Sequence, residues 1–171
     1  MNRLLNLLIT KSAVKSVFQM AMFAVVVALS GCSSNDPIPL IVSHKVIISV
    51  GDEVNPYGGN KSHPIVLRVY QLSESGTFQK SGFIDLYRKD IEVLGGSLVD
   101  VHNVPPLVPG EQYTLALDIH RQSQYLAVFA EFANYDNAKS KAVIKLPQDS
   151  EAQLVIRVSG LSVSITEATD D

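Results

Sequence analysis

The side chains that could carry chemistry are few and scattered. No two of the four histidines, at positions 44, 63, 102 and 120, stand at metal-ligand spacing. Asp118 and His120 share one face of an alternating segment, but it is the polar face, which favours a solvated pair over a catalytic one. No nucleophile elbow, phosphate-binding loop or paired-carboxylate motif occurs. The sequence therefore predicts no catalytic, metal or cofactor site and favours a binding or scaffolding module over an enzyme.

Two charged residues lie inside apolar runs. Arg68 stands within PIVLRVYQL (64–72), and Glu131 stands next to Phe132 in a run of aromatic and small residues. Strand parity allows Glu131 to face solvent on the less apolar side of its strand. It allows the same for Arg68, although an ion pair under the sheet edge is also possible. Neither residue is a catalytic signal.

Cys32 is the only cysteine, and its surroundings indicate a specific reaction of its thiol. A basic segment is followed by an apolar run over 17–29, which is too short to span a bilayer comfortably, and then by Ser30-Gly31. This order is typical of a secretory signal peptide. The junction resembles the bacterial lipobox, whose cysteine receives a diacylglycerol before cleavage. We expect residues 1–31 to be a lipoprotein signal peptide and Cys32 to be lipidated; the alternative is an ordinary signal peptide beside a chance cysteine.

The mature chain predicted by this cleavage is acidic. Residues 32–171 contain eleven Lys and Arg against seventeen Asp and Glu, a formal charge of −6. That balance argues against nucleic acid or anionic headgroups as partners, so acyl chains must supply the attachment. Residues 32–40 are rich in Ser, Asn, Asp and Pro and are expected to form the acylated, flexible tether. Ser33, rather than an aspartate, fits sorting to the outer membrane.

Beyond the tether, apolar and polar residues alternate with a period of two. Eight β-rich runs are separated by turn signals, among them Gly58-Gly59, Pro105-Pro106, Pro109-Gly110 and Ser159-Gly160. The runs lie near 44–50, 64–72, 97–101, 113–119, 124–133, 141–146, 154–158 and 161–165. Short strands with one apolar face require two sheets packed on each other. We predict an all-β domain over 41–168, a two-sheet β-sandwich of about eight strands.

One segment, near 81–95, has helical spacing instead. Ser81 is the expected N-cap and Gly95 the expected residue after the helix. An apolar stripe is expected to pack one or two short helices against the sandwich; its members are Phe83, Leu86, Tyr87, Ile91 and Leu94.

The segment 55–72, NPYGGNKSHPIVLRVYQL, resembles the region that marks the TssJ lipoproteins of the bacterial type VI secretion system. The similarity continues in order through the Phe83-Ile84-Asp85-Leu86-Tyr87 stretch, Pro109-Gly110 and the run 125–130, behind the lipobox. One departure is the absence of tryptophan: relatives carry Trp-Arg where Ser140-Lys141 stand. A lost Trp removes a large buried or interfacial surface, which would fit either a divergent branch or a paralogue with altered contacts.

The resemblance implies a non-enzymatic outer-membrane lipoprotein with a transthyretin-like β-sandwich. It implies that the protein faces the periplasm, binds the periplasmic C-terminal domain of the inner-membrane protein TssM and, through TssM, joins a complex with TssL. In the family, the loop between the first two strands carries much of that contact. Here the loop is Gly51–His63, and the partner-binding residues would be Asn55, Pro56, Tyr57, Gly58, Gly59, Asn60 and Lys61.

Three other interpretations remain open. The loop could be a long hairpin connection without a partner. The protein could be a periplasmic ligand- or glycan-binding lipoprotein, although a chain without Trp is poorly equipped with exposed aromatic platforms. A hydrolase with a transthyretin-like fold is disfavoured by the lack of a converging His, Arg and Ser constellation.

Overall fold

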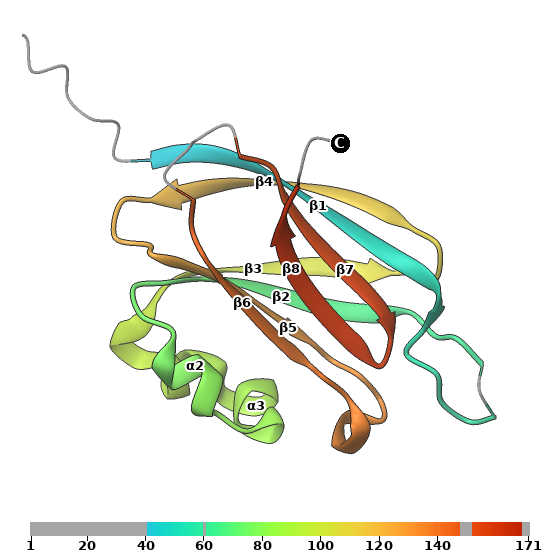
Figure 1. Cartoon of the computed structure of the whole chain (residues 1–171). Coiled ribbons are helices and arrows are strands. Elements are labelled where there is room, and N and C mark those ends of the chain that lie inside the picture. Colours follow the sequence, from blue (N-terminus) through green and yellow to red (C-terminus); the bar gives the residue numbers. More distant parts are fainter. Residues whose placement is uncertain (1–40, 60, 148–151, 169–171) are drawn as a thin grey trace, which may run out of the picture. The chain divides into compact units, whose positions relative to one another are not determined.

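Two four-stranded sheets pack face to face in the computed structural model, which describes residues 41–59, 61–147 and 152–168 (Figure 1). One sheet has the order β4-β1-β7-β8 and the other β3-β2-β5-β6. The strands are β1 (Ile41–Val54), β2 (Ile65–Leu72), β3 (Leu98–Leu107), β4 (Gln112–His120), β5 (Tyr125–Ala130), β6 (Lys141–Lys145), β7 (Leu154–Gly160) and β8 (Ser162–Glu167). The predicted β-sandwich is confirmed. The predicted signal peptide and tether lie outside the described residues.

β1 is the longest strand and spans the first sheet from end to end. It pairs antiparallel with β4 and parallel with β7, and its register with β7 shifts between Val50 and Val54. β1 has 14 residues and begins at Ile41, the first described residue. At the usual rise per residue, its length places Ile41 about 40 Å from the β1–β2 loop. The two points therefore lie at opposite ends of the sandwich (Figure 1).

The second sheet is covered on both faces, which explains the continuous apolar run of β5. Leu126 and Val128 point into the core between the sheets, whereas Ala127 and Phe129 point to the opposite face, towards the helices. All four side chains have no exposed surface. A strand buried on both faces loses the alternation of apolar and polar residues.

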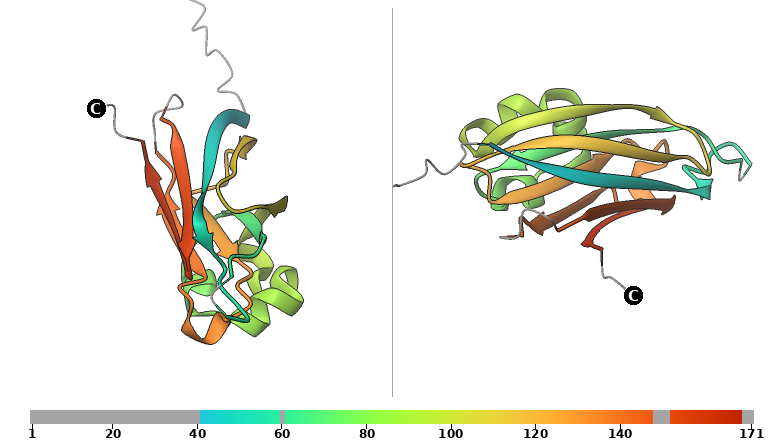
Figure 2. Two further views of the ribbon diagram at one scale, coloured as in Figure 1. Left: turned by 90° about the vertical axis from the view of Figure 1, so that its right-hand side faces the viewer. Right: turned by 90° about the horizontal axis from the view of Figure 1, so that it is seen from above.

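The helical insertion packs on the outer face of this sheet (Figure 2). It consists of α2 (Gly76–Lys80), α3 (Phe83–Leu94) and the 3₁₀ turn η1 (Gly95–Ser97). Phe78, Leu86 and Leu94 supply its buried apolar side chains. The insertion was predicted near 81–95 and begins earlier, at Gly76.

Two details of the helix prediction were wrong. Ser81 is the C-cap of α2, where its hydroxyl donates to the Thr77 carbonyl at 2.7 Å, and Gly82 precedes α3 instead. The backbone of Lys89 leaves the helical region (φ −154°), which breaks the helical phase of the apolar stripe. Ile91, beyond this break, is 64% exposed, and Tyr87, before it, is 50% exposed and stacks on Phe83 with ring centroids 6.0 Å apart, so neither side chain is buried against the sheet. Gly95 ends α3 with φ of 48°, as expected.

The Pro105-Pro106 pair was predicted as a turn and instead lies inside β3. β3 is an edge strand, and its register with β2 shifts where the prolines stand, between the pairs of Ile65 with Leu107 and of Leu67 with Val104. Proline donates no backbone hydrogen bond, so an edge strand with a bulge is the part of a sheet that accepts it.

Candidate functional site

Asn55 fixes the base of the β1–β2 loop. Its backbone adopts φ of 48°, the left-handed region that asparagine tolerates better than other non-glycine residues. Its side-chain amide donates to the Pro64 carbonyl and accepts from the Ala133 backbone N–H, both at 2.9 Å. Its own N–H donates to Gly160 in the β7–β8 turn at 2.8 Å. Asn55 is 6% exposed and therefore holds three segments together rather than offering a contact surface.

The tip of the loop is a tight hairpin. The Tyr57 N–H donates to the Lys61 carbonyl at 3.1 Å, and the imidazole Nε2 of His63 lies 3.1 Å from the Tyr57 carbonyl. Gly58 and Gly59 make the turn with φ of 61° and 96°. A Cβ at either glycine would meet nothing within 4 Å, so backbone conformation rather than space requires glycine here.

This hairpin presents Tyr57 to solvent. The Tyr57 side chain is 61% exposed, Gly58, Gly59 and Lys61 are also exposed, and Pro56 is half-buried. Asn60, the remaining predicted contact residue, lies outside the described residues. The structure thus brings the predicted residues into one projection at the end of the sandwich, with Asn55 as its support (Figure 1). An exposed aromatic ring on a fixed backbone loses little conformational entropy on binding.

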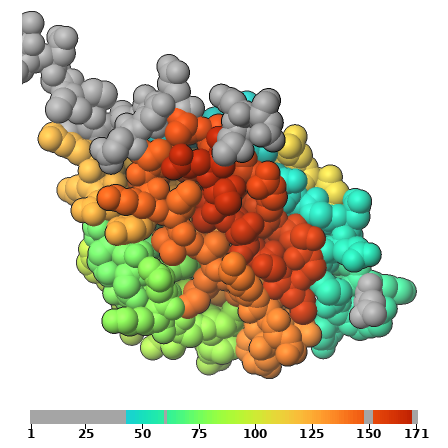
Figure 3. Space-filling model, viewed as in Figure 1, coloured from blue at the N-terminus to red at the C-terminus, as the bar shows by residue number. Residues whose placement is uncertain are grey.

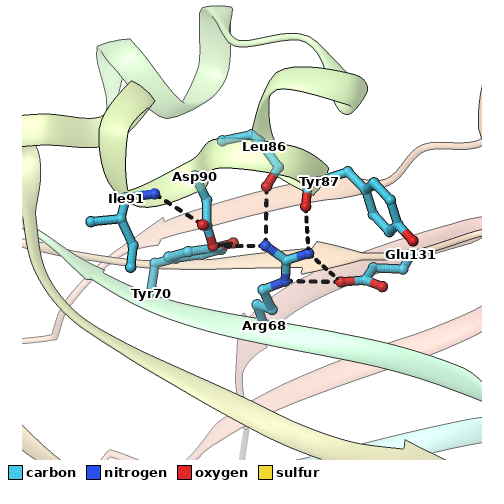
Figure 4. A network of polar contacts seen from close by, with 7 residues as sticks. All are labelled: Arg68, Tyr70, Leu86, Tyr87, Asp90, Ile91 and Glu131. Carbon is cyan, nitrogen blue, oxygen red and sulfur yellow. Dashed lines mark hydrogen bonds and ion pairs between the residues drawn. The ribbon is translucent and has the colours of Figure 1, made fainter.

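A second polar cluster lies beneath α3 and is centred on Arg68 (Figure 4). The guanidinium donates five hydrogen bonds, two to Glu131, one to Asp90 at 2.8 Å, and one each to the backbone carbonyls of Leu86 and Tyr87. The side chains of Arg68, Asp90 and Glu131 are 15–17% exposed. The ion pair considered for Arg68 is therefore present, and Glu131 is one of its partners rather than the solvent-facing residue that strand parity allowed.

Tyr70 completes this cluster, and its hydroxyl donates to Asp90 at 2.8 Å. Burial raises the pKa of the Tyr70 phenol, and the hydrogen bond to Asp90 raises it further. Burial alone would lower the pKa of Arg68 and raise that of Asp90, but their mutual hydrogen bond reverses both effects: the pKa of Arg68 is raised and that of Asp90 is lowered. All three groups keep their ordinary charge states at neutral pH, which suits a structural clamp between sheet and helix.

The Arg-x-Tyr-Gln-Leu segment of β2 thus has a structural explanation. Arg68 and Tyr70 bind α3, while Gln71, on the opposite face, donates to the Asp118 carbonyl at 2.9 Å and accepts from the His120 N–H at 3.0 Å. Gln71 is completely buried, so these bonds link the two sheets. Sequence reasoning missed this role; the signal for it was a polar residue in a run otherwise suited to a central strand.

Lys141 is one of the two residues that the resemblance matched to a family Trp-Arg pair. Its ammonium donates to the carbonyls of Phe78, Gln79 and Ser81, at the C-terminal end of α2. Cations are favourable at helix C-termini, where carbonyls lack partners within the helix. Burial lowers the pKa of Lys141. The lysine therefore ties α2 to β6.

The described part of the chain contains no group of three or more His, Cys, Asp or Glu side chains placed to hold a metal ion. Among the same residues, no helix has the length and apolarity needed to cross a membrane. Cys32 lies outside the described residues, and its lipidation stays a prediction.

A family model of type VI secretion lipoproteins, described by the names VasD, EvfM and TssJ, matches residues 43–161. The chain belongs to this family. The family is membrane-associated and consists of structural, non-enzymatic components of the type VI secretion system. The resemblance found in the sequence is therefore confirmed. A comparison with curated proteins finds no match.

Solved structures of similar fold support the same architecture. The T6SS lipoprotein TssJ1 from Pseudomonas aeruginosa is 21% identical, with a TM-score of 0.70 over 77% of this chain and 99% of that chain. Lip from Serratia marcescens, a membrane bound component of the type VI secretion system, is 23% identical, with a TM-score of 0.68 over 76% and 99%. A chain in the structure described as the T6SS protein TssM C-terminal domain (869-1107) from EAEC is 18% identical, with a TM-score of 0.59 over 76% and 100%. At these identities the likeness shows the fold.

Proposed function

We propose that this protein anchors the type VI secretion membrane complex to the outer membrane by binding the periplasmic C-terminal domain of TssM. TssL joins the same assembly through TssM. The β1–β2 hairpin, from Pro56 to Lys61, is the contact surface, and Asn55 holds it in place. The observation that carries the proposal is the exposed Tyr57 ring on a hairpin braced at its base.

The placement of the hairpin supports a protein with two attachments. The chain enters β1 at one end of the sandwich, and the hairpin projects from the other end, about 40 Å away at the usual strand rise. In this proposal residues 1–31 are removed, Cys32 carries the lipid, residues 32–40 form the tether and 41–168 form the domain. A lipid at one end and a partner at the other make the domain a rigid spacer.

The hairpin assignment is tested by replacing Tyr57 with alanine and measuring binding of the purified TssM periplasmic domain. Truncating an aromatic anchor at the centre of an interface costs about 2 kcal/mol or more, so the Kd should rise at least about 30-fold. Tyr87→Ala is the matched control, because Tyr87 is also exposed but lies on α3. If both variants bind like the wild type while remaining folded, the hairpin assignment is wrong.

The lipid anchor is tested separately with Cys32→Ser. The variant should move from the outer-membrane fraction to the soluble periplasmic fraction and stop type VI secretion, because the acidic charge of the mature chain disfavours binding to anionic headgroups once the acyl chains are lost. Purified Cys32→Ser protein should still bind TssM. Retention of this variant in the outer-membrane fraction would contradict the assignment of Cys32 as the anchor.

A further inference from the structure

A groove runs along the free edge of the second sheet, far from the β1–β2 hairpin in sequence. Its volume is about 390 Å³, and it lies between the C-terminal end of α2, β6 and β8. Phe78, Val143 and Ile165 contribute apolar surface, and Lys139 and Lys141 contribute positive charge. Figure 3 shows the face that carries β6 and β8.

The backbone of β6 presents unpaired hydrogen-bonding groups to this groove. The Ala130 N–H donates to Ser140 and the Leu146 N–H donates to Gln124, both at 2.8 Å, so the even-numbered residues of this segment bond to β5. In an antiparallel ladder, alternate residues point their N–H and C=O groups to opposite sides. The groups of Lys141, Val143 and Lys145 therefore point away from β5, at the sheet edge.

The residue just before β6 shows that this edge can bond to a further strand. Lys139 donates its N–H to the Leu161 carbonyl at 2.8 Å and accepts from the Val163 N–H at 3.0 Å, in a parallel bridge to the start of β8. Beyond this bridge β6 and β8 belong to different sheets and form no ladder within the described residues, and the groove opens between the two strands. The backbone of Lys139, just before β6, is thus hydrogen-bonded to β8, whereas the outward-facing backbone groups of β6 from Lys141 onward have no strand beside them.

The charge of the groove is opposite to that of the chain. Among the eight described residues that line it, two are lysines and none is acidic. Lys145, an exposed residue at the end of β6, adds a third positive charge, whereas the mature chain predicted by cleavage before Cys32 carries a formal charge of −6. Lysines on an edge strand discourage pairing between like chains, and a partner strand with carboxylates at matching positions would find them favourable.

We propose that the edge of β6 binds an extended, acidic segment of a partner protein, which adds a strand to the second sheet. Main-chain hydrogen bonds to Lys141 and Val143 supply the affinity, and carboxylates facing the exposed ammonium groups of Lys139 and Lys145 supply the selectivity. This surface is separate from the hairpin of the proposed function and stands on its own observations.

The test uses the protein from Ser33 onward and two ten-residue probe peptides, one alternating Val with Glu and one alternating Val with Lys. Binding is measured by isothermal titration calorimetry at low salt. The Glu peptide should bind at least tenfold more tightly than the Lys peptide. Equal binding, or no binding of the Glu peptide, would overturn the proposal.

Two variants separate strand addition from simple charge attraction. Val143→Pro removes the backbone N–H that faces the groove and leaves the hydrogen bonds between β6 and β5 intact. Because edge strands accept proline, this variant should fold. Its affinity for the Glu peptide should fall at least tenfold. Lys139→Glu should lose a similar amount, while Lys45→Glu, an equal charge change on exposed β1 surface, should bind as the wild type does. If Val143→Pro binds normally while folded by circular dichroism, the edge is not the binding element and the proposal fails.

Discussion

Replacing Arg68 with methionine should destabilise the domain by about 3 kcal/mol. Methionine keeps the unbranched stem but removes five donated hydrogen bonds and leaves Asp90 and Glu131 without their cation. Breaking a fully buried ion pair by removing one partner costs about 3–5 kcal/mol. Because the Arg68 side chain is 15% exposed, we expect a cost at the lower end of that range. The side chains of Asp90 and Glu131 are 15% and 17% exposed, so water relieves only part of the penalty.

The assay is urea unfolding of the protein from Ser33 onward, followed by circular dichroism. Arg68→Lys is the informative companion, because an ammonium cannot reproduce the planar fork that reaches Glu131, Asp90 and two carbonyls at once. We expect Arg68→Lys to recover less than half of the loss. Glu131→Gln should cost less than Arg68→Met, because Arg68 then keeps Asp90 as a partner. A loss below about 1 kcal/mol for Arg68→Met would refute the reasoning, since that is the contribution of an ordinary surface pair.

Two further predictions concern groups around the same elements. The pKa of Asp90 is lower in the folded state than its unfolded value, so its contribution to stability is complete above about pH 4 and is lost as the pH falls through the folded pKa. Asp90→Asn should therefore weaken the dependence of the free energy of unfolding on pH below about pH 4, measured by urea unfolding from pH 2 to 7. An unchanged pH dependence would contradict a stabilising role for the Asp90 carboxylate. Asn55→Ala should cost about 2–3 kcal/mol, because it removes two hydrogen bonds at a residue with positive φ, whereas Asn55→Gly should cost less. Equal costs for the two variants would show that backbone conformation plays no part.

The strands were predictable from the sequence because most of them have one buried face. Leu154, Ile156 and Val158 are buried in the core between the sheets, in the alternation that predicted β7. The Pro105-Pro106 error arose because the tolerance of a strand for proline depends on its place in the sheet, and strand order is not visible in a local pattern.

The polar contacts were harder to predict because they join residues far apart in the chain. Arg68 and Glu131 are adjacent only after β2 and β5 pair, and Asp90 reaches them only after α3 folds over that sheet. The role of Asn55 had the same limit: a loop asparagine predicts a turn, but its bond to Ala133 depends on tertiary packing. Local sequence did predict the glycine turn at Gly58-Gly59, whose conformation is set by neighbouring residues.

The central claim is that the β1–β2 hairpin binds the TssM periplasmic domain. Amide hydrogen exchange of the protein from Ser33 onward, with and without saturating TssM domain, tests it most directly. We predict slower exchange at Tyr57, Gly58, Gly59 and Lys61 on binding, with the exposed backbone around Lys89 in α3 unchanged. Formation of the complex with unchanged exchange throughout the hairpin would contradict the claim.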